Sequence, residues 1–325
     1  MKKRTIILLF SLFVISYTYA NHQPPEDSTK VKQRHYRTTK VTTLPPSIDG
    51  LLEDEAWNSV DWSSGFIERQ PNEGENPKNQ TSFKIIYDEK NIYLAFRCHD
   101  SEPEKIVRRL TRRDGFDGDW VEVNIDSYND KRTAFSFTIN AAGVIGDEFI
   151  TNNGNNWDSN WNPIWYAKTN IDEKGWTAEM KIPLSQLRFG DKAIHEWGLQ
   201  FTRYDFRHQE RSNWKFIPQN TAGWVSNFGV LEGITDIQPQ KQIEIQPYVL
   251  ALAETFEKEE GNPYATGSGT RMSAGLDAKI GITNDLTLDL AINPDFGQVE
   301  ADPAALYLDD MQLFFAERRP FFIEK

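Results

Sequence analysis

The sequence predicts an all-β protein: an antiparallel β-sandwich, followed by the C-terminal strands of an incomplete β-barrel. Short runs of alternating aromatic and β-branched residues recur along the chain, separated by Asn, Asp, Gly and Pro, which is the pattern of strands joined by turns. Aromatic residues reach 13% although hydrophobic residues are only 38%, as in β-rich proteins. Helical periodicity is scarce, and only Leu52–Ser59 and Ser185–Leu187 are candidates for single helical turns.

Length, charge and cysteine content limit the classes of function. A chain of 325 residues suggests about two domains. Its formal net charge of -12 argues against a nucleic-acid partner, because binding to phosphates needs clustered cations. The single cysteine, Cys98, rules out an internal disulfide framework and a cysteine-cluster metal site. The sequence has no phosphate-binding loop and no GxSxG motif, and we expect no organic cofactor.

The N-terminus has the features of an export signal. Met1–Arg4 is positively charged, Thr5–Thr18 is apolar and uncharged, and the small residue Ala20 marks a cleavage site, so we predict a signal peptide over residues 1–20. The alternative is an uncleaved membrane anchor, but the apolar run is shorter than the ~20 residues that a spanning helix needs. The polar segment 21–40 is predicted to be a disordered leader.

The predicted sandwich covers residues 41–237. Six of its segments alternate and are predicted to be strands: 82–87, 92–98, 120–126, 134–140, 176–182 and 197–203. The first two flank the turn Asp88–Asn91 and are predicted to form a hairpin. Many short strands with regular turn signals favour a sandwich of two sheets.

The pattern changes after Gln240. Apolar residues alternate with small or polar ones over 243–253, 274–282 and 286–292, with a turn at Asn284-Asp285. Stretches of this length and alternation match transmembrane β-strands, although a soluble sheet with one wet face gives the same alternation. Three strands cannot close a barrel, since even small barrels need about eight. The segment 240–325 is therefore predicted to hold the first strands of a barrel, or else an appendage of the sandwich.

Several motifs in order resemble the family 9 carbohydrate-binding modules. They are IDGLLEDEAW at 48–57, YDEKNIYLAF at 87–96, DWVEVNID at 119–126, RTAF at 132–135, NAAG at 140–143 and GWTAE at 175–179. The resemblance covers about residues 44–237 and implies a carbohydrate-binding β-sandwich with an oligo- or polysaccharide as partner.

The tail resembles a second family. NPDFGQVEADP at 293–303 and ERRPFF at 317–322 are similar to a Bacteroidetes-type family in which such a module precedes an outer-membrane barrel domain (domain of unknown function 5916). This resemblance implies that 240–325 begins that barrel, with the outer membrane as a second partner. It also implies export to the outer membrane, the periplasm or the cell surface of a Gram-negative bacterium.

The predicted sugar site centres on the strand 120–126. Trp120, Glu122 and Asn124 share one face because the side-chain period of a strand is two, and an aromatic face beside fixed polar groups suits a sugar ring. By resemblance Trp120, Glu122 and Arg132 hold the sugar, and a second stacking tryptophan comes late in the module, at Trp214 or Trp224. Alternatively, Trp120 packs under a loop and Glu122–Arg132 is a cross-strand pair. Another aromatic series occurs at 157, 161 and 165, all Trp.

A calcium site is a further expectation. Asp114, Asp117 and Asp119 lie within a loop that also holds two glycines, and oxygen ligands in a flexible loop suit calcium. Structural calcium is also implied by the resemblance. The alternative is a solvated acidic turn.

Two other functions compete with sugar binding. A glycoside hydrolase needs a general acid and a base, and four acidic residues are candidates, although nothing in the sequence pairs any two of them: Glu122, Asp126, Glu148 and Glu179. The five histidines form no HExxH motif and no triad-like grouping. The third possibility is an outer-membrane transport or interaction protein that binds no sugar.

Overall fold

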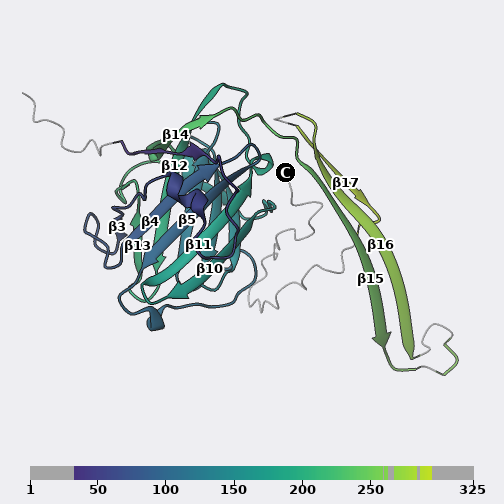
Figure 1. Cartoon of the computed structure of the whole chain (residues 1–325). Coiled ribbons are helices and arrows are strands. Elements are labelled where there is room, and N and C mark those ends of the chain that lie inside the picture. The colour runs from purple at the N-terminus through teal and green to yellow at the C-terminus, as the bar shows by residue number, and fades with distance from the viewer. Residues whose placement is uncertain (1–32, 259, 263–266, 284–285, 295–325) are drawn as a thin grey trace, which may run out of the picture. The chain divides into compact units, whose positions relative to one another are not determined.

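The computed structural model describes residues 33–258, 260–262, 267–283 and 286–294 (Figure 1). Four predictions fall wholly or mainly outside these residues: the signal peptide over 1–20, most of the leader, the turn at 284–285, and the tail motifs.

The larger sheet of the sandwich has nine strands. Its main path runs in the order β1 (His35–Arg37), β14 (Gly229–Thr235), β12 (Ile194–Asp205), β6 (Trp120–Asp126), β7 (Ala134–Asn140), β8 (Ile145–Thr151) and β9 (Asn156–Asp158). Off this path, β13 (Glu210–Asn213) pairs with β12 and with β3 (Ile67–Gln70). All of these pairs are antiparallel except β1 with β14.

The second sheet has five strands, in the order β10 (Tyr166–Asp172), β11 (Gly175–Pro183), β5 (Asn91–His99), β4 (Thr81–Tyr87) and β2 (Thr39–Lys40). The predicted all-β class and the six predicted sandwich strands are confirmed, as β4, β5, β6, β7, β11 and β12. One boundary differs from its prediction. The predicted leader extends to residue 40, but residues 35–37 and 39–40 form β1 and β2, because they pair in parallel with β14 and β4.

The helical elements are all short 3-10 turns: η1 (Glu55–Ser59), η2 (Pro103–Lys105), η3 (Asn152–Gly154), η4 (Leu184–Gln186) and η5 (Val225–Asn227). η1 and η4 coincide with the two predicted helical turns. Within the part of the chain that the structure covers, no helix is long and apolar enough to cross a membrane.

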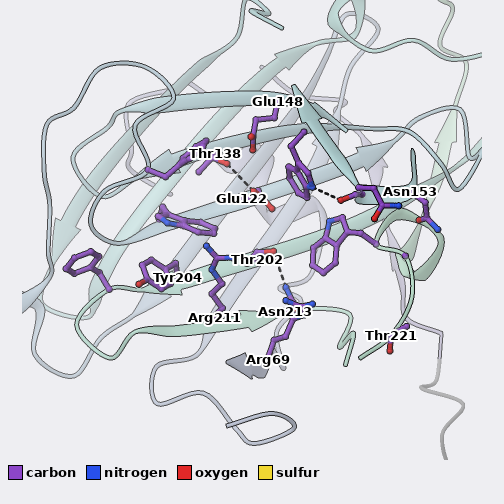
Figure 2. A pocket seen from close by; sticks show the side chains of 18 residues that line it. Arg69, Glu122, Thr138, Glu148, Asn153, Thr202, Tyr204, Arg211, Asn213 and Thr221 are labelled. Atoms are coloured by element: carbon purple, nitrogen blue, oxygen red, sulfur yellow. Dashed lines mark hydrogen bonds between the residues drawn. The ribbon is translucent and has the colours of Figure 1, made fainter. Parts of the chain in front are cut away.

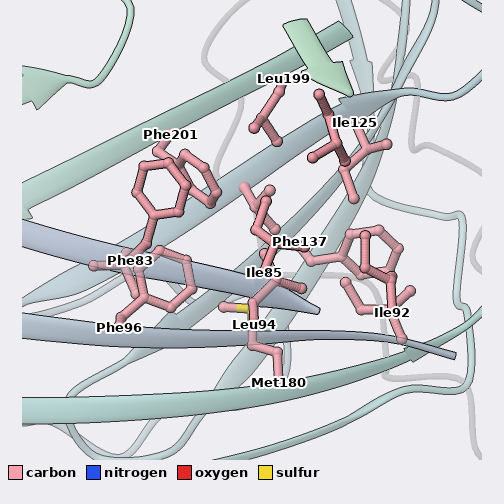
Figure 3. Packing of buried hydrophobic residues seen from close by; sticks show 14 of the residues in the cluster. Phe83, Ile85, Ile92, Leu94, Phe96, Ile125, Phe137, Met180, Leu199 and Phe201 are labelled. Atoms are coloured by element: carbon pink, nitrogen blue, oxygen red, sulfur yellow. The ribbon is translucent and has the colours of Figure 1, made fainter. Parts of the chain in front are cut away.

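Aromatic side chains join the two sheets. The ring of Phe201 on β12 lies 3.8 Å from that of Phe83 on β4 and 5.4 Å from that of Phe96 on β5, measured between centroids, and Figure 3 shows the three rings packed together. On β6 the alternate residues Val121 and Val123 are fully buried in this core. Because side chains alternate across a strand, their neighbours Trp120 and Glu122 face away from the core.

The C-terminal strands form a separate sheet in the order β15 (Ile243–Thr255), β16 (Ser268–Gly281) and β17 (Thr287–Ile292). The register aligns Ile243 with Ile280 and Ile280 with Leu288, so apolar side chains of all three strands share one face. Polar residues such as Glu244, Lys279 and Thr287 share the other face. The predicted alternation over this segment is confirmed.

Candidate functional site

A cleft of about 650 Å³ lies on the face of the larger sheet that is turned away from the core. Its floor and walls come from β3, β6, β7, β8, β12 and β13, and from the loops around residues 153–157 and 221–224. Figure 2 shows the side chains that line it. They are Arg69, Phe116, Trp120, Glu122, Thr138, Glu148, Asn153, Gly154, Asn155, Trp157, Thr202, Tyr204, Phe206, Arg211, Asn213, Thr221, Gly223 and Trp224.

Strand register brings a row of polar side chains across the floor of the cleft. Glu122 on β6 lies opposite Thr138 on β7 and Thr202 on β12, and Thr202 lies opposite Asn213 on β13. The Thr138 hydroxyl donates to Oε2 of Glu122 at 3.5 Å, and Nδ2 of Asn213 donates to the Thr202 hydroxyl at 3.0 Å. The floor therefore presents a fixed set of donors and acceptors.

Trp120 is packed tightly at one end of the cleft. Its ring centroid lies 5.5 Å from that of Tyr204 and 6.4 Å from that of Phe116. The guanidinium carbon of Arg211 lies 5.4 Å from the Trp120 centroid, a distance at which a cation is attracted to the ring face. Only 7% of Trp120 is exposed. The side chain lines the cleft, but its neighbours cover most of the ring.

Two half-buried tryptophans line the other end. Nε1 of Trp224 donates to Oδ1 of Asn124 at 2.8 Å, and Nε1 of Trp157 donates to the carbonyl of Gly154 at 2.9 Å. The guanidinium carbon of Arg69 lies 5.5 Å from the Trp224 ring centroid. Each indole is therefore fixed by its N–H group, while part of its ring stays accessible.

Asn153 connects the two loops that carry these tryptophans. Its carbonyl accepts from the backbone N–H of Trp224 at 2.8 Å, its Oδ1 accepts from the Ser226 N–H, and its Nδ2 donates to the Ser226 hydroxyl, both at 2.9 Å. Asn153 has a φ of 59°, in the left-handed region that asparagine tolerates better than most residues. The Asn-rich loop thus positions the aromatic wall.

Two carboxyl groups of the cleft have raised pKa values. Burial raises the pKa of Glu122, although hydrogen bonds and Arg211 act in the opposite direction. Burial also raises the pKa of Glu148 to about 7, and the negative charges of Glu122, Asp114 and Asp147 raise it further. Near neutral pH the Glu148 carboxyl group can therefore hold a proton as well as accept a hydrogen bond.

Three of the five predicted sugar-binding residues lie in the cleft: Trp120, Glu122 and Trp224. Trp214 does not, because it is fully buried in the core, where its Nε1 donates to the Ser63 hydroxyl at 3.0 Å. Arg132 is exposed in the turn between β6 and β7 and does not line the cleft. The predicted Glu122–Arg132 pair is wrong, because Thr138 and Thr202 are the residues opposite Glu122.

Sequence reasoning missed several lining residues. Arg211, Arg69 and Asn213 lie on the short strands β13 and β3, where four residues give too little alternation to show a strand.

Of the tryptophan series in the Asn-rich region, only Trp157 lines the cleft. Trp161 and Trp165 pack against Phe137 in the core, with ring centroids 5.5 Å and 5.3 Å from that of Phe137. The sequence signal that could have identified Trp157 as a site residue is its place at the end of a loop rich in Asn and Gly.

The three aspartates proposed as calcium ligands have separate partners. Oδ1 of Asp114 accepts from the Asp147 N–H at 3.0 Å, both carboxylate oxygens of Asp117 accept from Nη1 of Arg109 at 3.1 Å, and Asp119 pairs with buried Arg203 at 3.3 Å. Among the residues that the structure covers, no three His, Cys, Asp or Glu side chains are grouped to hold a metal ion. The calcium site stays a prediction.

The candidate catalytic carboxylates separate into two groups. Glu122 and Glu148 line the cleft. The carboxylate of Asp126 accepts from the backbone N–H groups of Asp130 and Lys131 at 3.2 Å and 2.8 Å and holds a turn. Glu179, on the second sheet, accepts from Trp57, Asp49 and Gly50 at 2.9–3.1 Å, and so it anchors the N-terminal motif.

Comparison with known families gives two matches. The model of the carbohydrate family 9 binding domain-like family matches residues 48–232. The model of a domain of unknown function (DUF5916) matches residues 239–325. Both resemblances expected from the sequence motifs are confirmed. A search of curated proteins finds no match.

Among solved structures, three similar chains illustrate the likeness. Two are a family 9 carbohydrate-binding module from Caldicellulosiruptor kristjanssonii, in complex with glucose and with cellotriose; each is 18% identical with a TM-score of 0.46, covering 64% of this chain and 97% or 95% of the other. The third, from Bacteroides uniformis, is described as a candidate carbohydrate-binding protein. It is 14% identical with a TM-score of 0.51, covering 62% of this chain and all (100%) of that chain. This third likeness supports the sandwich fold.

Proposed function

The chain belongs to the carbohydrate family 9 binding domain-like family through residues 48–232, and on that premise we propose that it binds an oligo- or polysaccharide in the cleft over β6, β12 and β13. Its role is to hold the glycan, and no chemical step is assigned to it. The glucose and cellotriose complexes of the Caldicellulosiruptor module make glucose-based oligosaccharides the first ligands to test.

The observation that carries this proposal is the order of groups along the cleft. Trp157 and Trp224 at one end offer apolar surface for the C–H face of a sugar ring. Glu122 and Asn213 on the floor supply acceptor oxygens for hydroxyl groups, since Oδ1 of Asn213 has no hydrogen-bond partner among the described residues. Because the indoles and the floor are fixed by internal hydrogen bonds, little ordering is needed on binding, which favours affinity.

The test is a glycan array followed by calorimetric titration of the full chain. Glu122→Gln keeps the shape of the floor and removes the charge, and it should weaken binding of the best neutral glycan by about tenfold, because hydrogen bonds to a charged group are the stronger ones. Glu173→Gln, at an exposed turn between β10 and β11, is the matched control. Absence of any bound glycan, or equal affinity of Glu122→Gln and wild type, would overturn the proposal.

A second role is favoured by the sheet β15–β17. Several side chains of its apolar face are highly exposed, including Ile243 at 63%, Val249 at 76% and Met272 at 76%. β15 and β16 have 13 and 14 residues, enough to cross a hydrocarbon layer of about 30 Å at a tilt. We propose that this face meets lipid in the outer membrane of an exported protein.

Vesicle flotation tests the membrane role. The full chain should float with phospholipid vesicles, and Val249→Glu should reduce the floating fraction, because a charge on the lipid face is costly. Glu244→Gln on the polar face is the control. Equal flotation of the three proteins would contradict this role.

A further inference from the structure

Two arginines of the cleft have almost no internal partners. Among the described residues, Arg211 has no hydrogen-bond or ion-pair partner, although its charge acts on Glu122. Its guanidinium carbon lies 5.4 Å from the Trp120 centroid and 5.6 Å from the Tyr204 centroid. Arg69 uses only Nε, which donates to the Ile217 carbonyl at 3.1 Å, and it lies over Trp224. Most of their donor groups are therefore free.

The two guanidinium groups act on each other. The charge of Arg211 lowers the pKa of Arg69, after the larger effect of burial, so the two cations lie close enough to repel. Figure 2 shows both of them with Asn213 on one side of the cleft, and Glu148 on the opposite side. An anion placed between Arg69 and Arg211 would relieve this repulsion.

The chemistry of these groups suits an anion. The N–H groups of a guanidinium match a carboxylate or another oxyanion with two parallel hydrogen bonds, and contact with an aromatic ring leaves these donors unused. The residues beneath are themselves packed: Trp120 on Tyr204 and Phe116, and Trp224 on Phe228 with centroids 5.8 Å apart. The aromatic groups beneath both arginines are thus in place before a ligand arrives.

The carboxyl groups of the cleft do not cancel this preference. Burial raises the pKa of Glu148 to about 7, so this carboxyl group can be neutral near neutral pH, whereas a guanidinium stays charged. Two guanidinium groups then stand against the one carboxylate of Glu122. A cationic amino sugar would have to approach Arg69 and Arg211, so the charges favour an anionic ligand over a cationic one.

We propose that the cleft is specific for acidic saccharides, and that Arg69 and Arg211 together bind an anionic sugar substituent, a carboxylate or a sulfate ester. The inference rests on the proposed sugar-binding function and defines its ligand class. Trp157 and the floor residues contact the sugar ring, and the two arginines select its charge.

Titration calorimetry of the full chain compares four ligands of equal length: neutral gluco-oligosaccharides, uronic acid oligosaccharides, sulfated oligosaccharides and glucosamine oligosaccharides. One of the two acidic ligands should bind at least about tenfold more tightly than the neutral one. Added salt should weaken acidic binding more than neutral binding. The stronger of the uronate and sulfate arms identifies the anionic group.

Variants then locate the selectivity. Arg211→Gln and Arg69→Gln should each remove most of the acidic preference, measured as the ratio of acidic to neutral affinity. Arg37→Gln, an exposed arginine on β1 outside the cleft, should keep the preference. Equal binding of neutral and acidic ligands by wild type, or tightest binding of glucosamine oligosaccharides, would overturn the inference and leave sugar binding intact. Binding of no saccharide at all would overturn both.

Discussion

The guanidinium of Arg211 lies over the ring of Trp120, with its carbon 5.4 Å from the ring centroid. Trp120 on β6 and Arg211 on β13 are both register partners of Tyr204 on β12, so the contact spans three strands. The consequence is that Trp120 is a support for a cation more than an open surface for a sugar. The exposed aromatic surface of the cleft comes from Trp224 and Trp157.

The first prediction distinguishes the roles of Trp214 and Trp224, the two candidates for the second stacking tryptophan. Trp224→Ala should weaken glycan binding by at least about tenfold, or about 1.4 kcal/mol, while the protein stays folded, because the side chain is half-buried at the cleft. Trp214→Ala removes a fully buried indole and should lower the free energy of unfolding by about 3–5 kcal/mol. Calorimetric titration and urea unfolding measure the two effects. The opposite assignment, with Trp214→Ala stable and impaired in binding, would show that the wrong residue was placed in the cleft.

The second prediction concerns the loop before Trp157. Gly154 has a φ of +94°, and a Cβ there would lie 2.4 Å from the Cβ of Trp224. Gly154→Ala should therefore displace the Trp224 wall, weaken glycan binding and lower stability by about 1–3 kcal/mol.

Gly74 is the matched control for this loop. It has a similar φ of +89°, and a Cβ added there would meet no atom within 4 Å. Gly74→Ala should therefore cost only the backbone strain, about 1 kcal/mol, and should leave binding unchanged. Binding unaffected by Gly154→Ala would mean that the loop does not position Trp224.

The alternation of apolar and polar residues along the sequence predicted those strands that bury one face in the core. On β6, Val121 and Val123 are fully buried as their spacing required, and the opposite face carries Trp120 and Glu122 into the cleft. The motif at 48–57 is also explained, since Asp49, Gly50 and Trp57 all bond to Glu179. In this chain the motif makes a structural contact with the second sheet.

The missed site residues depend on long-range pairing. Arg211 reaches the cleft because β13 pairs with β12, and Arg69 because β3 pairs with β13, and neither pairing follows from a local pattern in four-residue strands. Arg132 was implied by the resemblance, but it is exposed in the turn between β6 and β7 and does not line the cleft. Trp214 could not be distinguished from Trp224, because burial depends on the packing of both sheets.

The third prediction is a pH dependence of stability from Glu148. The folded protein holds the Glu148 proton up to a pKa of about 7, whereas the ordinary value is 4.5. Stability should therefore fall as the pH rises from about 4.5 to about 7, because the unfolded chain releases the proton first. Glu122, Asp114 and Asp147 surround the group, and Arg113 is paired to Asp147.

The variant Glu148→Gln isolates this effect. It cannot ionise, so it should match wild type near pH 4.5 and exceed its free energy of unfolding by roughly 1–2 kcal/mol at pH 8, allowing for screening by solvent. Urea unfolding at both pH values measures the difference, and Glu173→Gln at an exposed turn is the control. Parallel pH profiles of Glu148→Gln and wild type would contradict the prediction.

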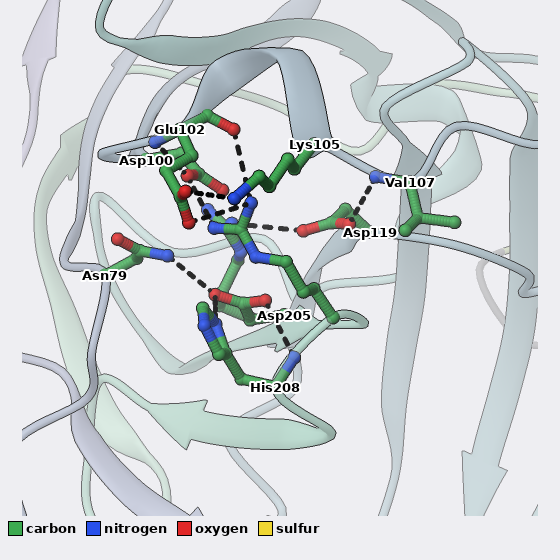
Figure 4. Close-up of polar contacts among 10 residues, drawn as sticks. Asn79, Asp100, Glu102, Lys105, Val107, Asp119, Asp205 and His208 are labelled. Atoms are coloured by element: carbon green, nitrogen blue, oxygen red, sulfur yellow. Dashed lines mark hydrogen bonds and ion pairs between the residues drawn. The ribbon is translucent and has the colours of Figure 1, made fainter.

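Buried charges at one edge of the sandwich give the fourth prediction. Arg203 and Asp119, each 1% exposed, pair at 3.3 Å, and Asp205 nearby accepts from Asn79 at 2.8 Å. Figure 4 shows Asp119, Asp205 and Asn79 within this network. Arg203→Gln leaves Asp119 as an uncompensated buried charge and should lower the free energy of unfolding by about 3–5 kcal/mol.

The exposed pair Arg109–Asp117, at 3.1 Å, is the matched control for the buried pair. Arg109→Gln should cost less than about 1 kcal/mol, because solvent screens the interaction. Chemical denaturation measures both variants. Similar costs for Arg203→Gln and Arg109→Gln would show that the buried pair is not an important source of stability.

The fifth prediction concerns the sheet β15–β17. Its apolar face exposes Ile243, Val249 and Met272, and a large exposed apolar patch lowers solubility in water. The sandwich core ends at Ile237, which is 3% exposed and packs in the main cluster. A variant that ends at Ile237 should therefore stay soluble and keep its free energy of unfolding within about 1 kcal/mol of the full chain. Circular dichroism and urea unfolding test this. Unfolding of the shortened protein would mean that β15–β17 stabilise the sandwich, and the proposal that their apolar face is reserved for lipid would fail.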